Sequence, residues 1–193
     1  KNFFFFFLAK GFDKDSLEIL KRKKNLRIID ISNFKIRNLT TLKSFDGSFL
    51  IQNKDNIVFD KKKLRCVTKL KPSKKEIAEM QFAFNICKHV KSNAIVLCNN
   101  FSTIGIGAGQ PSRLDSCKIA VQKAKNFQSS KIKNSIAASD AFFPFTDGIY
   151  ALIKAGVKTI IQPGGSIRDQ EVINVANKAK IKMLFTGVRH FNH

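Results

Sequence analysis

The sequence has few of the features that mark membrane, secreted or zinc-binding proteins. Its longest apolar run, residues 3–9, is far shorter than the roughly 20 residues that cross a bilayer. No small-residue cleavage site follows this run, as a secretory signal would require. The four cysteines, Cys66, Cys87, Cys98 and Cys117, form no C-x-x-C pair. We therefore expect reduced, buried thiols in a cytoplasmic protein, and neither disulfides nor zinc ligands.

Acidic residues are also scarce, with 14 Asp and Glu against 35 Lys and Arg, so the formal net charge is +21. Such a charge can indicate a nucleic-acid partner. However, only seven of the basic residues are arginine, and the lysines are scattered along the chain. The phenylalanines lie in apolar runs and are not interleaved with basic residues, as single-strand binding requires. We interpret the charge as a lysine-rich solvated surface and keep a basic nucleic-acid-binding module as an alternative.

Apolar runs and helix-period patterns alternate along the chain, which predicts an α/β fold with helices on both faces of a sheet. The chain length of 193 residues suits one domain with a real core. A strand-like run begins close after Lys1, which favours a cut inside a longer protein. Strands are expected at residues 3–8, 26–31, 48–52, 57–59, 65–69, 94–98, 102–106, 157–162 and 182–186. Asp46-Gly47 indicates a hairpin turn in a β-rich stretch.

Capping signals set the helix bounds. Asp13 or Asp15 can cap a first helix, and Ser73 and Glu76 have the spacing of a capping box. Gly156 is placed to end another helix. Helices are expected at residues 16–23, 73–90, 112–127, 147–155 and 168–179.

The first stretch that could carry chemistry is 102-STIGIGAGQPSR-113, where an expected strand runs through three glycines into a helix. Glycine lets a ligand approach the backbone, and a helix N-terminus offers N–H groups to an anion. The spacing is not the G-x-G-x-x-G of dinucleotide sites, so a tight turn and a phosphate cradle are equally compatible with it. Arg113 favours a ligand, because a cation in the first helical turn opposes the helix dipole.

Three later stretches could also bind a ligand. In 139-SDAFFPFTDG-148, Asp147 can cap the next helix, and a capped loop with core phenylalanines competes with an aromatic wall for a flat ligand. The stretch 162-QPGGSIRD-169 again joins a strand, a glycine-rich turn and a helix, where ligands of open α/β sheets gather. The chain closes on 189-RHFNH-193. The four stretches together hold three of the seven arginines, Arg113, Arg168 and Arg189. A planar bidentate fork for phosphate or carboxylate requires arginine.

Five ordered segments resemble one known family: 91-KSNAIV-96, 103-TIGIGAGQPSR-113, 139-SDAFFPFTDG-148, 162-QPGGSIRD-169 and 186-TGVRHFNH-193. They are similar to the C-terminal part of the bifunctional purine biosynthesis protein, which joins an IMP cyclohydrolase to an AICAR transformylase. The resemblance covers nearly the whole chain. It implies that residues 72–193 form a cytidine-deaminase-like α/β/α lobe with a mixed sheet. Residues 1–71 would end the preceding lobe and link the two.

The resemblance also implies an enzyme, a formyltransferase of de novo purine (IMP) biosynthesis. The formyl group would pass from the co-substrate 10-formyltetrahydrofolate to the 5-amino group of AICAR. The implied partners are AICAR, folate and a second copy in a cytoplasmic homodimer, with no nucleic acid and no membrane.

Six residues match the functional positions of the family. The resemblance implies catalytic roles for Asn93, which would position the amine and formyl group, and for His193, which would lie near the reacting centre. The implied substrate-binding residues are Arg113, Phe142, Asp147 and Arg189. Among these, the two arginines would bind the nucleotide, and the aromatic ring and carboxylate would contact its base and sugar side.

The chain also departs from the family pattern. The catalytic Lys-His pair and the cyclohydrolase domain of the family lie outside the matching part, so we expect the isolated chain to be nearly inactive. The H-x-E and P-C-x-x-C motifs of zinc deaminases are absent, so no catalytic metal is expected. Thr146 stands where many relatives carry arginine, and no role is assigned to Arg168. A nucleotide-binding lobe without catalysis is a further alternative.

Overall fold

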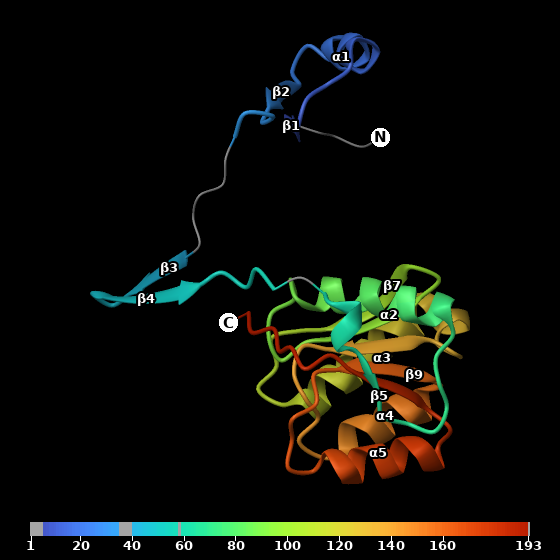
Figure 1. The fold of residues 1–193 in the computed structure, drawn as a ribbon. Coiled ribbons are helices and arrows are strands. Elements are labelled where there is room, and N and C mark those ends of the chain that lie inside the picture. The colour runs from blue at the N-terminus through green and yellow to red at the C-terminus, as the bar shows by residue number, and fades with distance from the viewer. Residues whose placement is uncertain (1–5, 35–39, 58, 193) are drawn as a thin grey trace. The chain divides into compact units, whose positions relative to one another are not determined.

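The computed structural model describes residues 6–34, 40–57 and 59–192, and Figure 1 shows their helices and strands. The chain divides into two compact units, Lys1–Lys54 and Asp55–His193. This division precedes residue 71, where the sequence analysis placed a boundary. The predicted catalytic residue His193 lies outside the described residues, as do residues 3–5 of the first expected strand.

The first unit contains a β-α-β segment. Strands β1 (Phe6–Ala9) and β2 (Arg27–Asp30) are parallel, and helix α1 (Lys14–Lys21) connects them. Of the two aspartates considered as caps, Asp13 is the one used, because its Oδ1 accepts a hydrogen bond from the Ser16 N–H at 2.8 Å.

A hairpin completes the first unit. Strands β3 (Thr40–Phe45) and β4 (Ser48–Asn53) are antiparallel. The predicted turn at Asp46-Gly47 is confirmed, and both residues have positive φ, +43° and +73°, as the tight turns of hairpins require. Strand β3 was not predicted. In its sequence, Thr-Thr-Leu-Lys-Ser-Phe, Leu42 and Phe45 fall on opposite faces of a strand, so neither face shows the apolar alternation on which a strand prediction rests.

The second unit is built on a six-stranded mixed sheet. Its strands, in spatial order, are β5 (Arg65–Cys66), β10 (Lys182–Phe185), β9 (Thr159–Gln162), β8 (Ile136–Ser139), β6 (Ile95–Asn99) and β7 (Ser102–Gly107). Strands β8, β9 and β10 are parallel, whereas β6 is antiparallel to both of its neighbours and β5 to β10. The strand expected at 57–59 includes residue 58, which is outside the described residues, and neither Ile57 nor Phe59 is in a strand.

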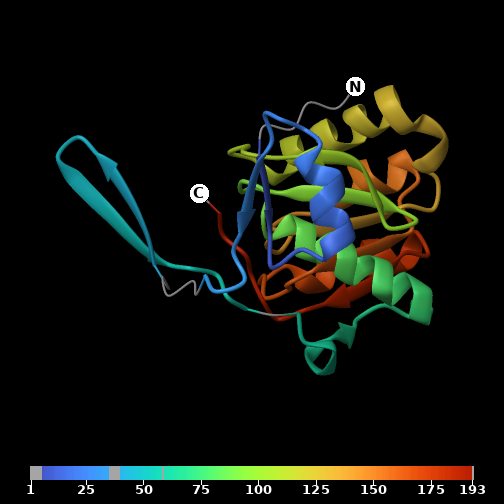
Figure 2. The same ribbon diagram turned by 90° about the horizontal axis from the view of Figure 1, so that it is seen from above.

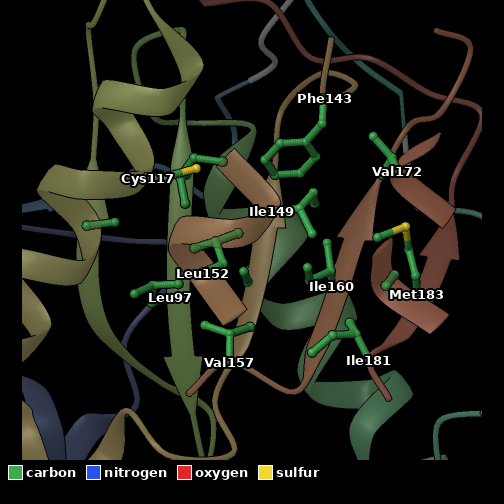
Figure 3. Packing of buried hydrophobic residues seen from close by; sticks show 14 of the residues in the cluster. Leu97, Cys117, Phe143, Ile149, Leu152, Val157, Ile160, Val172, Ile181 and Met183 are labelled. Atoms are coloured by element: carbon green, nitrogen blue, oxygen red, sulfur yellow. The ribbon is translucent and has the colours of Figure 1, made fainter. Parts of the chain in front are cut away.

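Helices cover both faces of this sheet, so the predicted three-layer α/β/α architecture is confirmed. Alternate residues of β6 point to opposite faces: Ile95 packs in one buried cluster with α3, α4 and α5, and Val96 packs in the other with α2. Figure 2 shows α2 and α3 on opposite sides of the sheet, and Figure 3 shows Ile149 of α4 packed beside Ile160 of β9. The helices are α2 (Lys74–Cys87), α3 (Arg113–Gln128), α4 (Asp147–Ala155) and α5 (Asp169–Lys178), with short 3-10 turns at Lys61–Lys63 and Ser129–Lys131.

The predicted start of α2 and the predicted end of α4 are both confirmed. Ser73 and Glu76 form a complete capping box, in which each side chain accepts a backbone N–H of the other. Gly156 ends α4 in the left-handed conformation, with φ +103°, which glycine adopts without a Cβ clash.

The glycines before α3 serve packing. A Cβ on Gly107 would lie 1.9 Å from the Ser116 carbonyl oxygen, and one on Gly105 would lie 2.1 Å from that of Ala120. Strand β7 and helix α3 therefore approach too closely for any side chain at these positions. Neither a tight turn nor a phosphate cradle, the two readings left open for this stretch, accounts for Gly105 and Gly107, because both glycines lie within β7 and pack against α3.

All four cysteines are free. Three are buried, and burial raises the pKa of their thiols, to about 12 for Cys98 and Cys117. Cys66 is exposed, against the expectation of buried thiols. Within residues 6–192 as described, no three His, Cys, Asp or Glu side chains gather as metal ligands, and no helix is long and apolar enough to span a membrane.

We expect Gly107→Ala to destabilise the chain by about 3 kcal/mol, because the added methyl group must push α3 away from β7. Urea denaturation of the 193-residue chain measures this loss. Ser102→Ala is the matched control, because Ser102 lies on the same strand with an exposed side chain. Equal stabilities of the two variants would contradict the packing role of Gly107.

A second prediction concerns pH. Burial would raise the pKa of Glu76, but hydrogen bonds from Lys182 and Ser73 and the charge of Lys182 outweigh it, so the pKa lies below its ordinary value of 4.5. The Lys182 Nζ lies 2.6 Å from the Glu76 Oε1. A lowered carboxyl pKa stabilises the fold above the unfolded-state pKa, and this stabilisation is lost as pH falls through the folded-state pKa.

Glu76→Gln should therefore lower the free energy of unfolding by about 1 kcal/mol at pH 7, and the difference from wild type should shrink below pH 4.5. Asp115→Asn is the control, because its ion pair with Lys118 is half-exposed on both sides and 3.8 Å long; such pairs contribute little. A Glu76→Gln deficit that stays constant down to pH 3 would contradict the prediction.

Candidate active site

One pocket of about 410 Å³ collects five of the six predicted site residues. These are Asn93, Arg113, Phe142, Asp147 and Arg189. They come from four separate segments: the residue pair before β6, the start of α3, the loop from β8 into α4, and the C-terminal tail. The sixth, His193, is outside the described residues, so its role stays a prediction.

The N-termini of two helices open into this pocket. Ser112 precedes α3 and Thr146 precedes α4, and neither side chain caps its helix. The prediction that Asp147 is an N-cap is wrong. Asp147 is the first residue of α4, and its Oδ1 accepts from the neighbouring Gly148 N–H at 2.6 Å. At the start of α3, the uncapped N–H groups and the positive end of the helix dipole favour an anion on this side of the pocket.

Arg113 is buried, with 8% of its surface exposed, and it is paired within the protein. Its Nη1 donates to the Asp140 Oδ1 at 2.6 Å and to the Ser139 Oγ at 2.7 Å, and its Nη2 donates to the Asn93 Oδ1 at 2.8 Å. From the sequence, a cation at this helix start favours a ligand. The structure removes this reason for expecting one, because the Asp140 carboxylate already balances the charge.

Asp140 is the central residue that the sequence analysis missed. It is fully buried, and its Oδ2 accepts from the Ser92 Oγ at 2.6 Å. Its backbone carbonyl accepts from the His190 N–H at 2.9 Å, which ties the C-terminal tail to the end of β8. One signal could have found it: a carboxylate in the apolar context Ala-Ala-Ser-Asp-Ala-Phe-Phe needs a buried cation or donors.

Asn93 joins the start of α3 to the start of β6. Its side-chain Nδ2 donates to the backbone carbonyls of Gln110 at 2.9 Å and Pro111 at 3.1 Å. The backbone carbonyl of Asn93 accepts from the Ser116 Oγ. With the Arg113 contact, every polar group of the side chain is bonded within the protein. The arrangement fixes Asn93 at the pocket wall beside the guanidinium.

Two arginines lie over phenylalanine rings at the pocket. The Arg189 Cζ is 4.6 Å from the ring centre of Phe142, and the Arg168 Cζ is 4.8 Å from that of Phe145. Phe143, between the two phenylalanines, points into the core and donates its N–H to the buried Gln162 side chain. The loop therefore divides its aromatic residues between core and pocket. Arg168, to which no role was assigned, contacts a pocket residue.

The model of the AICARFT/IMPCHase bienzyme family matches residues 1–123. The "Bifunctional purine biosynthesis protein PurH" of Bartonella tribocorum is 49% identical over 185 residues, which are 91% of this chain and 34% of that protein. The protein of the same name from Aquifex aeolicus is 45% identical over 96% of this chain and 36% of its own length. The chain belongs to the AICARFT/IMPCHase bienzyme family. It spans about a third of the length of the curated relatives it matches.

Solved structures give weaker likenesses for this member of the bienzyme family. The dCMP deaminase from the cyanophage S-TIM5 is 19% identical over 59% of this chain and 98% of its own, with a TM-score of 0.42. The Acinetobacter baumannii RibD is 15% identical over 55% of this chain and 35% of its own, with the same TM-score.

We expect Asp140→Ala to lower the free energy of unfolding by about 3–5 kcal/mol, because it leaves the buried Arg113 charge unpaired. Urea denaturation of the 193-residue chain measures the loss. The double variant Asp140→Ala with Arg113→Met should lose less than the sum of the two single variants, since they remove the same interaction. Strict additivity would contradict a direct pairing of the two side chains.

Proposed function

We propose that the chain is the C-terminal part of a bifunctional purine biosynthesis protein and contributes one half of its AICAR transformylase site. In this proposal, a formyl group passes from 10-formyltetrahydrofolate to the 5-amino group of AICAR. The partners are these two small molecules and, in the cell's cytoplasm, a second copy of the protein. Neither nucleic acid nor a membrane is a partner.

One observation carries the proposal. Asn93, Arg113, Phe142, Asp147 and Arg189 are spread over almost a hundred residues of sequence, and they line a single pocket. The same five residues match functional positions of the transformylase in sequence, and a match in sequence does not by itself place residues together in space. Membership of the AICARFT/IMPCHase bienzyme family supports the same assignment.

The pocket has the chemistry that a ribonucleotide requires. Phe142 offers an aromatic face, and flat rings stack on such faces. Arg189 is exposed and can form bidentate bonds to a phosphate, which the uncapped start of α3 also favours. Asp147 is an exposed carboxylate at the pocket wall, and it can accept hydrogen bonds from sugar hydroxyls or an exocyclic amine.

Formyl transfer requires orientation and proton movement. The AICAR amine attacks the formyl carbon, the amine loses a proton, and the bond from carbon to the folate nitrogen breaks as that nitrogen gains a proton. Residues of this chain would orient the reactants, with Asn93 fixed beside Arg113 at the pocket wall. His193 would serve near the reacting centre, since histidine exchanges protons near neutral pH. The catalytic Lys-His pair would come from the remainder of the protein.

The test is a chimera. The segment of the Bartonella tribocorum protein that aligns with this chain is replaced by the 193 residues, and AICAR transformylase activity is measured. We expect activity in the chimera and little in the isolated chain. Arg189→Ala should raise the KM for AICAR about tenfold, a loss of ~1.4 kcal/mol, because it removes the exposed cation over Phe142.

Lys125→Ala is the matched control, because Lys125 is an exposed cation on α3 that does not line the pocket. A chimera that folds, binds AICAR and shows no transfer would support a nucleotide-binding lobe without catalysis and overturn the proposal. Normal turnover by the isolated 193 residues would equally contradict a half-site.

A further inference from the structure

The C-terminal tail reaches the pocket without regular secondary structure. Strand β10 ends at Phe185, and the described residues after it form neither helix nor strand. The position of Arg189 therefore depends on single contacts along residues 186–192. Some are backbone bonds, such as the Thr186 N–H to the Gln162 carbonyl at 2.9 Å and the Ser92 N–H to the Asn192 carbonyl at 2.8 Å.

His190 makes a buried side-chain contact that holds this tail. Only 4% of its surface is exposed, its ring lies 4.8 Å from that of Phe84, and its Nδ1 is hydrogen-bonded to the Asp55 Oδ2. Its neighbour Arg189 is exposed and lies over Phe142. The two residues are joined by a single planar peptide bond, so a contact that fixes His190 inward also restricts the directions that the Arg189 side chain can take.

Asp55 is itself held in place, so it can act as an anchor. Its Oδ1 accepts from the Ile57 N–H at 3.1 Å and lies 3.6 Å from the Nζ of Lys88, which also donates to the Ile57 carbonyl at 2.9 Å. Burial would raise the pKa of Asp55, but the bonds from His190 and Ile57 and the nearby positive charges outweigh it, so the pKa is lowered. The carboxylate therefore stays charged at neutral pH.

We propose that Asp55 and His190 are positioning residues, which clamp the C-terminal tail so that Arg189 is held over Phe142 to receive the substrate. The inference rests on the proposed function, because the substrate that Arg189 meets is taken from it. Neither Asp55 nor the His190 side chain lines the pocket. The pair acts on binding only through the backbone between residues 189 and 190.

Two variants distinguish the contribution of the hydrogen bond between His190 and Asp55 from the contribution of ring packing against Phe84. His190→Phe keeps an aromatic ring beside Phe84 and removes Nδ1, whereas Asp55→Ala keeps the histidine and removes its acceptor. In the chimera, each should raise the KM for AICAR about fivefold while changing kcat less. The double variant should be no worse than either single variant, because both break one bond. Asp55→Asn, which retains an acceptor oxygen, should restore most of the affinity.

Glu76→Gln is the control, because it weakens an ion pair with Lys182 that lies outside residues 186–192 and whose carboxylate is about as exposed as that of Asp55, 26% against 23%. Additive effects of the two clamp variants would overturn the inference. So would a lower thermal stability with an unchanged KM, since that result is expected of a merely structural pair.

A second measurement is independent of the enzymatic activity. In the 193-residue chain, hydrogen exchange of the His190 and Asn192 amides should be at least about tenfold faster in His190→Phe and Asp55→Ala than in Glu76→Gln. Unchanged exchange would overturn the clamp. If the unsubstituted chimera is inactive, the proposed function fails, and the exchange rates alone decide whether the clamp holds the tail. Faster exchange with an unchanged KM in an active chimera would contradict its positioning role.

Discussion

The ion pair between Arg113 and Asp140 is the constraint on which the rest of the site depends. Burying two charges is expensive, and a buried pair is tolerated only when its remaining donors and acceptors are also satisfied. Both Asp140 oxygens accept hydrogen bonds, from Arg113 and Ser92, and Arg113 also bonds Ser139 and Asn93. Meeting this requirement draws the start of α3, the end of β8 and the residues before β6 to one point, and they form the pocket wall there.

The register of the sheet explains why these segments can meet. Ile95 of β6 pairs with Ser139 of β8 and with Gly107 of β7, and both pairings are antiparallel. The chain therefore enters β6 at the same edge of the sheet where it leaves β7 and β8. The pocket residues of these segments therefore lie near one another: Asn93 comes just before β6, Arg113 begins the helix that follows β7, and Phe142 follows β8. The absence of side chains at Gly105 and Gly107 lets α3 lie close enough for Arg113 to reach Asp140.

Much of the fold could be predicted from the sequence, because its signals are local. The capping box at Ser73, the left-handed Gly156 and the Asp46-Gly47 turn each depend on a few neighbouring residues. Strand β8 was missed because Ile-Ala-Ala-Ser is short and carries one β-branched residue, so only its neighbours in the sheet define it. Asp140 was missed for the same reason: its partners are 27 and 48 residues away. Strand register is a long-range property that local sequence signals do not reveal, and it determines which residues meet at the pocket.

The use of arginine in a lysine-rich chain now has a physical reading. Two of the seven arginines, Arg113 and Arg189, line the pocket, and a third, Arg168, lies over the pocket residue Phe145. Arg113 donates hydrogen bonds to three side chains, whereas Arg189 and Arg168 lie over phenylalanine rings. An ammonium group has neither the plane for stacking nor the fixed fork for several acceptors. The net charge of +21 is therefore a poor indicator of what this protein binds. The positions of Arg113 and Arg189 in the pocket are a better one.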